Sequence, residues 1–235
     1  MEIKIAVSKI RKYASRTSGD TVEVTERPNG GVSVVMADGQ SSGRGAKWVS
    51  SFVVRKVISL LAEGVRDGAA ARAASDALFT ERGGKVSATL NMLSADLETH
   101  TLVITRNNPA PVLIAQDDEI KLLNEPCKPI GLYRGTRPII TQLDLEVGLT
   151  VVIFTDGITH AGKRIGQPLD AIECVQVMLE DGEPTAQEIA DSLLEYALKL
   201  DQGRPVDDTS VVVLRVMPDE ENLIRRMTIE LPVRP

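Results

Sequence analysis

Aspartates recur in this sequence at the ends of predicted strands, a placement that suits metal chemistry. Val32–Ala37 is a run of β-branched and apolar residues that predicts a buried strand, and it ends at Asp38-Gly39. A strand holds its terminal aspartate rigidly, and the following glycine lets its backbone carbonyl come close to the same ion. Asp38 and Gly39 are therefore candidate metal ligands.

Other predicted strands carry aspartates at their edges in the same way: Asp156 after Thr150–Thr155, Asp207-Asp208 before Ser210–Val216, and Asp20 before Thr21–Thr25. If these strands adjoin in space, the carboxylates converge into an all-oxygen site, which Mg²⁺ and Mn²⁺ prefer. Each acidic pair alone is more commonly a turn or a strand cap. The prediction of a metal site therefore rests on their combination.

Composition bounds the class of protein. The chain has 235 residues, 43% hydrophobic and 26% charged, and no linker-like tract divides it, so one large domain is expected. The formal net charge of -6 argues against a nucleic-acid partner. Cys127 and Cys174 are widely separated and show no paired spacing, so neither a disulfide framework nor a zinc site is expected.

Two further observations concern histidine and location. His100 and His160 are too few for a histidine-based metal centre. His160 follows Asp156 closely, and either a loop role or a place near the site remains open for it. No signal peptide and no apolar run long enough to span a bilayer is present, so a cytoplasmic protein without a membrane partner is expected.

Hydrophobic periodicity predicts the elements that must position these residues. Helical spacing indicates Arg44–Ala62, Ala69–Glu81, Asp170–Leu179 and Thr185–Leu200. Thr185 and Glu188 predict a capping box at the start of the last helix. Strand patterns indicate Ile3–Val7, Thr21–Thr25, Val32–Ala37, Val86–Leu93, Thr101–Arg106, Val112–Ala115, Ile120–Leu123, Ile139–Leu145, Thr150–Thr155 and Ser210–Val216, with Met227–Leu231 as a peripheral strand. The order predicts an α+β layered fold in which helix pairs cover antiparallel sheets.

Four motifs in order, S-G-D, A-D-G-x-x-S-G, F-T-D-G and D-D-x-S, span Asp20 to Asp208. Together they resemble the signature of the type-2C metal-dependent serine/threonine protein phosphatases. The similarity is greatest to the bacterial stage II sporulation E-like branch and, within it, to small stand-alone phosphatases of stress signalling. The resemblance implies a four-layer αββα sandwich of two antiparallel sheets flanked by helix pairs. It covers residues 1–217 as a phosphatase domain and leaves 218–235 as a C-terminal extension.

The resemblance also implies roles for individual residues. Asp38 would bridge two divalent cations, Mn²⁺ or Mg²⁺, and Gly39 would offer its carbonyl to one of them. Asp156 and Asp207 would hold the second cation, and Asp20 would lie at the first. Asp38, Asp156 and Asp207 would thus form the catalytic set, and Asp208 stands next to a ligand position.

The sequence departs from the family pattern at several places. Ser210 stands where the branch usually has threonine, which preserves a hydroxyl group. The segment 106–111 (R-N-N-P-A-P) replaces a G-H-x-P-P-like loop. Arg16, Arg44 and Lys47 are candidate phosphate partners, although a solvated surface role is the alternative for each.

The chemistry implied is hydrolysis of a phosphoserine or phosphothreonine monoester by a hydroxide that bridges two cations about 4 Å apart. The substrate implied is a phosphorylated regulatory protein, such as an anti-sigma-factor antagonist or a stress-signalling scaffold. One alternative is a catalytically silent module that keeps the phosphatase fold and regulates a signalling partner. A second is a metal-dependent hydrolase of small phosphoesters or nucleotides, although no P-loop motif is present.

Overall fold

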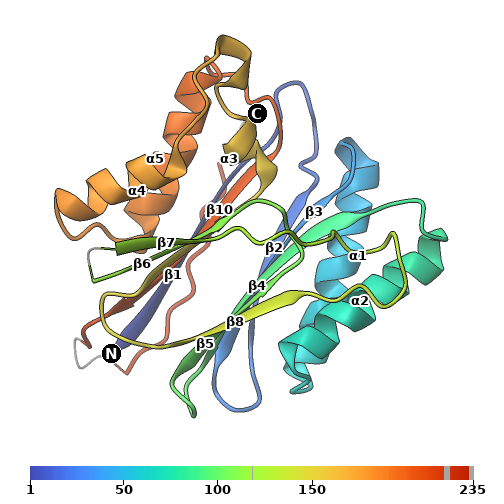
Figure 1. Cartoon of the computed structure of the whole chain (residues 1–235), viewed down its shortest axis with the longest axis horizontal. Coiled ribbons are helices and arrows are strands. Elements are labelled where there is room, and N and C mark those ends of the chain that lie inside the picture. Colours follow the sequence, from blue (N-terminus) through green and yellow to red (C-terminus); the bar gives the residue numbers. More distant parts are fainter. Residues whose placement is uncertain (118, 220–222, 233–235) are drawn as a thin grey trace.

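Two antiparallel β-sheets lie face to face, and helices cover the outer side of each sheet (Figure 1). The computed structural model describes residues 1–117, 119–219 and 223–232. The predicted α+β sandwich with helix, sheet, sheet and helix layers is confirmed. Within the described residues, no helix combines the length and the apolar character that crossing a bilayer requires.

The first sheet has the strand order β1-β10-β9-β6-β7, with the bounds β1 Glu2–Ile10, β10 Thr209–Met217, β9 Thr150–Phe154, β6 Val112–Gln116 and β7 Glu119–Leu123. The second sheet has the order β2-β3-β4-β5-β8, with the bounds β2 Asp20–Glu26, β3 Val32–Gly39, β4 Ala88–Asp96, β5 Thr101–Arg106 and β8 Ile139–Asp144. Neighbouring strands are antiparallel throughout both sheets.

Helices α1 (Gly43–Ala62) and α2 (Asp67–Arg82) pack on the second sheet, whereas α4 (Ala171–Glu180) and α5 (Ala186–Leu200) pack on the first (Figure 1). Three apolar clusters correspond to the three interfaces between the four layers. The middle cluster fills the space between the sheets with inward-facing residues such as Val34, Leu93 and Val212. Alternation along β3 places Val34 and Met36 in this middle cluster and Val35 and Ala37 against the helices.

Local sequence signals account for how two helices, α5 and α4, begin. The Thr185 side chain accepts a hydrogen bond from Glu188 N, and the Glu188 carboxylate accepts one from Thr185 N, so the predicted capping box is present. The Asp170 carboxylate accepts hydrogen bonds from the amides of Ile172 and Glu173 and caps α4 in the same manner.

Two expectations about elements were incomplete or wrong. A short helix, α3 (Asp156–His160), and a 3₁₀ turn, η1 (Lys163–Ile165), follow β9 where no helix was predicted. The predicted strand Met227–Leu231 is absent: these residues are irregular and exposed, because no neighbouring strand pairs with them among the described residues. Alternation of apolar residues predicted a strand there, but alternation alone supplies no pairing partner.

Candidate metal centre

Antiparallel pairing brings the acidic strand ends together in each sheet. The start of β2 lies beside the end of β3, so Asp20 is the direct cross-strand partner of Asp38. In the other sheet, the end of β9 lies beside the start of β10, with Phe154 opposite Val211. Asp156 and Asp207 extend from these two strand ends and therefore come close to each other.

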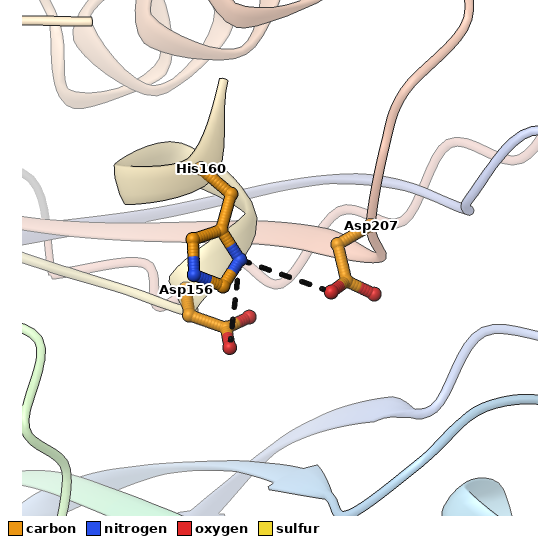
Figure 2. Close-up of side chains that lie close together, drawn as sticks. All are labelled: Asp156, His160 and Asp207. Carbon is orange, nitrogen blue, oxygen red and sulfur yellow. Dashed lines mark ion pairs between the residues drawn. The ribbon is translucent and has the colours of Figure 1, made fainter. Parts of the chain in front are cut away.

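Asp156, His160 and Asp207 form a group that could hold a metal ion (Figure 2). One ligand atom of each residue lies within 4.8 Å of those of the other two. The Nδ1 atom of His160 is 3.8 Å from an Asp156 oxygen and 3.9 Å from an Asp207 oxygen. These side chains are 32–41% exposed and therefore accessible to an ion from solvent.

One pocket, with a volume of about 470 Å³, has Asp38, Gly39, Asp156 and Asp207 among its lining residues. Two of these residues come from the second sheet, and the other two follow β9 and precede β10 of the first sheet. The structure therefore brings together predicted site residues that the sequence separates by up to 169 positions, from Asp38 to Asp207.

Asp20, the cross-strand partner of Asp38, is fully buried and does not line this pocket. Its Oδ2 atom accepts hydrogen bonds from Thr155 Oγ1 at 3.0 Å and from Ser210 Oγ at 2.6 Å. Its Oδ1 atom has no hydrogen-bond partner. A buried carboxylate oxygen without a partner is costly. This orphaned oxygen, together with a donor set of carboxylates, a carbonyl and one imidazole, fits a hard divalent cation.

The electrostatics of the site indicate the same deficit of positive charge. Burial, followed by the neighbouring charges of Asp20 and Asp156, raises the pKa of Asp38 to about 9. Burial and the charge of Asp207 raise the pKa of Asp156. Burial also raises the pKa of Asp20, although the hydroxyl groups of Ser210 and Thr155 act in the opposite direction. Close carboxylates of this kind require compensation if they are to remain ionised together.

Glycines allow the close packing that this geometry needs. A Cβ atom at Gly39 would lie 2.1 Å from the carbonyl oxygen of Ala46, so only glycine fits where α1 passes the end of β3. A Cβ atom at Gly157 would lie 2.4 Å from the carbonyl oxygen of Asp208 and would separate α3 from the start of β10. The Asp-Gly pairs are thus required by packing as well as by turn formation.

Several residues have roles that sequence reasoning assigned differently or missed. The carboxylate of Asp208 accepts hydrogen bonds from Lys12 N at 2.9 Å and Gly19 N at 2.7 Å, and thereby fixes the loop before β2. Lys47 donates to the carbonyl oxygen of Asp20 at 2.9 Å, which gives it a structural contact. Neither Arg16 nor Arg44 lines the pocket.

The unusual segment 106–111 is held firmly beside the pocket. Arg106 is buried and pairs with Glu125 at 2.7 Å. Asn108 donates to Phe154 O at 3.1 Å and accepts from Ala110 N at 2.9 Å. Pro109 lines the pocket, so this segment supplies part of the wall with different residues from those of the expected loop.

Comparison with known proteins places this geometry in a class. A solved structure of the PP2C phosphatase domain and a fragment of the regulatory domain of SpoIIE from Bacillus subtilis aligns with a TM-score of 0.79 and 20% identity. That alignment covers 92% of this chain and 63% of that one. The catalytic domain of the serine/threonine protein phosphatase PstP, solved in complex with two manganese ions, aligns with a TM-score of 0.69 and 18% identity, over 92% of this chain and 99% of that one. The fold is that of the PP2C phosphatases.

Sequence comparison identifies the family. The sequence model described as Stage II sporulation protein E (SpoIIE) matches residues 28–217. The chain therefore belongs to the SpoIIE family. Stage II sporulation protein E of Bacillus subtilis (strain 168) is 23% identical over 205 residues, which cover 87% of this chain and 24% of that protein. This chain thus corresponds to about a quarter of the length of that relative.

Proposed function

We propose that this chain is a metal-dependent protein-serine/threonine phosphatase that hydrolyses phosphoserine or phosphothreonine on a bacterial signalling protein. The observation that carries the proposal is the convergence of Asp38, Asp156 and Asp207 on one pocket, together with the unpartnered oxygen of Asp20, the cross-strand neighbour of Asp38. Membership of the SpoIIE family and the PP2C fold support the same activity.

In this proposal the pocket holds two divalent cations, Mn²⁺ or Mg²⁺. Asp38, near the end of β3, would contact both cations, with the Gly39 carbonyl and Asp20 at the first and with Asp156 and Asp207 at the second. Bound cations of this kind activate water near neutral pH and neutralise charge on phosphoryl oxygens. Asp38, Asp156 and Asp207 are the proposed catalytic set because they would hold the cations that activate the water.

Protein groups around the pocket would orient the phosphate. Lys12 lines the pocket, with its Nζ atom 3.8 Å from Asp207, and it would pair with a phosphoryl oxygen. Ser42 also lines the pocket and is the N-cap residue of α1, with no side-chain cap hydrogen bond. The unpaired amides at a helix N-terminus favour an anion, so the start of α1 would also support phosphate binding.

The proposed substrate is a phosphorylated regulatory protein, such as an anti-sigma-factor antagonist or a stress-signalling scaffold. Family membership supports this assignment. The proposed phosphatase domain is residues 1–217, with 218–235 as an extension, and the agreement between the end of the family match and the end of β10 at Met217 supports that boundary.

The test is Mn²⁺-dependent hydrolysis of p-nitrophenyl phosphate and of a phosphoserine peptide by wild-type protein and by Asp38→Asn. We expect the variant to lose at least about 100-fold in rate, because its neutral amide cannot hold two cations. Asp96→Asn is the matched control: Asp96 is a partly exposed residue at the end of β4 away from Asp38, and this variant should keep full activity. An active Asp38→Asn protein would exclude the proposed role of Asp38.

The rival functions predict different results in the same preparation. A catalytically silent interaction module would show no divalent-cation binding by titration calorimetry at millimolar metal. A hydrolase of small phosphoesters would cleave nucleotides faster than a phosphoserine peptide. The carboxylate cluster and the PP2C fold favour the phosphatase over both alternatives.

A further inference from the structure

His160 occupies a position that the acidic motifs do not account for. Its Nδ1 atom faces the carboxylates of Asp156 and Asp207 at 3.8 and 3.9 Å (Figure 2). Both distances exceed the range of a hydrogen bond. The nitrogen is therefore near two oxygens to which it is not hydrogen-bonded, and one ligand atom of each residue lies within 4.8 Å of those of the other two.

The fold fixes this arrangement through α3. Asp156 is the first residue of the helix and His160 is the last, so their side chains lie four residues apart on one face. Ile158, between them, is buried in the core cluster beneath α4 and α5 and anchors the turn. Asp207 reaches the same face from the segment before β10. Because buried Ile158 anchors α3 in the core, the helix holds His160 on the side of the site.

We propose that His160 is a nitrogen ligand of the cation held by Asp156 and Asp207, an inference that rests on the proposed function. A cation about 2.0–2.2 Å from each ligand can join ligand atoms that lie up to about 4 Å apart. The three observed ligand atoms need little movement to reach that arrangement. The site at this position is then mixed, with two carboxylates and one imidazole.

Mixed ligation has a chemical consequence for metal choice. Magnesium binds oxygen ligands and gains little from imidazole, whereas imidazole favours later transition metals such as Co²⁺ and Zn²⁺. His160 therefore shifts the selectivity of the site toward transition metals. Replacing it with glutamine should weaken Co²⁺ binding by about ten-fold or more and change Mg²⁺ binding much less.

A different role for His160 gives different observations. A protonated His160 that only offsets the charge of the two carboxylates would leave no nitrogen in contact with the metal. In that case the glutamine variant would change Co²⁺ and Mg²⁺ affinity by the same factor. The ratio of the two affinities therefore separates a ligand from a neighbouring charge.

The direct experiment is pulsed EPR on the tag-free protein with substoichiometric Mn²⁺. A ligating imidazole produces a ¹⁴N modulation of the electron spin echo, and the chain has only two histidines, His100 and His160. We expect the modulation in wild type and in His100→Gln, and its loss in His160→Gln. Labelling histidine with ¹⁵N should change the modulation to that of ¹⁵N, a readout that needs no variant at the site.

The outcomes separate this inference from the proposed function. Loss of the aqueous Mn²⁺ signal on adding protein shows that the metal binds. Bound Mn²⁺ without nitrogen modulation, or modulation that persists in His160→Gln, would overturn the role of His160 and leave the carboxylate site standing. No bound Mn²⁺ at all would overturn both.

Discussion

Two acidic regions of this molecule differ in whether the chain itself supplies a cation for the buried carboxylate. Asp67, at the start of α2, lies 3.2 Å from the guanidinium of Arg27 and accepts a hydrogen bond from the hydroxyl of Ser94. Ser94 in turn pairs with Ser33 at 2.7 Å. The network links β3 and β4 to α2, and every member is supplied by the chain itself.

Asp20 and Asp38, at neighbouring strand ends, have no such cation from the described part of the chain, whereas Asp207 lies 3.8 Å from the ammonium group of Lys12. Among the residues that the structure describes, neither Asp20 nor Asp38 takes part in an ion pair. One oxygen of Asp20 has no hydrogen-bond partner, and the neighbouring acids add to the burial that raises the pKa of Asp38. Asp67, paired with Arg27, therefore serves the fold, whereas the charges of Asp20 and Asp38 would be offset by the proposed cations.

Replacing Arg27 should have the largest effect on stability and therefore tests the difference between the two regions most strongly. Replacing Arg27 with methionine leaves Asp67 buried without its cation, and we expect a loss of about 3–5 kcal/mol in the free energy of unfolding, measured in urea. Arg27→Met combined with Asp67→Asn should recover part of this loss, since it removes the isolated charge. A single-variant loss below about 1 kcal/mol would show that the pair is not the compensating interaction.

Added Mn²⁺ should stabilise the protein through the aspartates at the strand ends and not through the Arg27–Asp67 pair. At a Mn²⁺ concentration of 100 times the dissociation constant, the wild-type protein should gain about 2.7 kcal/mol of stability, measured as a shift in thermal unfolding. Arg27→Met should gain the same amount despite its lower starting stability. Asp38→Asn should gain little, and an equal gain in that variant would place the binding elsewhere.

Without metal, the two regions should respond to loss of an acid with opposite signs. Asp38→Asn removes one of several uncompensated carboxylates and should stabilise the metal-free protein by about 1–2 kcal/mol. Asp67→Asn should destabilise it, because Arg27 then keeps its charge without a partner. Urea unfolding in the presence of a chelator measures both, and the same sign for the two variants would remove the distinction.

Replacing Lys12 should have the smallest effect on stability of the changes considered. Its pairing with Asp207 spans 3.8 Å, and both side chains are about one-third exposed. Solvent screens such a pair, so Lys12→Ala should change stability by less than about 1 kcal/mol. It should raise KM for a phosphoserine peptide while leaving metal affinity nearly unchanged, which would confine the role of Lys12 to phosphate binding.

Much of this arrangement could be predicted from the sequence, because its signals are local. Apolar runs that end in Asp-Gly gave the strands and their acidic edges, and Thr185 with Glu188 gave a helix start. The order of strands and helix pairs along the chain was sufficient to predict the layered arrangement of sheets and helices. Asp38, Asp156 and Asp207 could be grouped because each stands at the edge of a predicted strand and because their motifs occur in the order of the phosphatase signature.

The remaining features depend on contacts that no local pattern encodes. Ser210 donates to Asp20 across 190 positions, and Thr155 does so across 135, so their support of the buried carboxylate is visible only in the fold. Helix α3 is a single turn of five residues, too short to show helical periodicity, and it is this turn that directs His160 to the site.

The most direct measurement of the central claim is anomalous diffraction from crystals soaked in Mn²⁺. We expect anomalous peaks in the pocket, in contact with Asp38 on one side and with Asp156 and Asp207 on the other. Crystals with full access to Mn²⁺ that show no peak at these carboxylates, or peaks only at other surface acids, would contradict it.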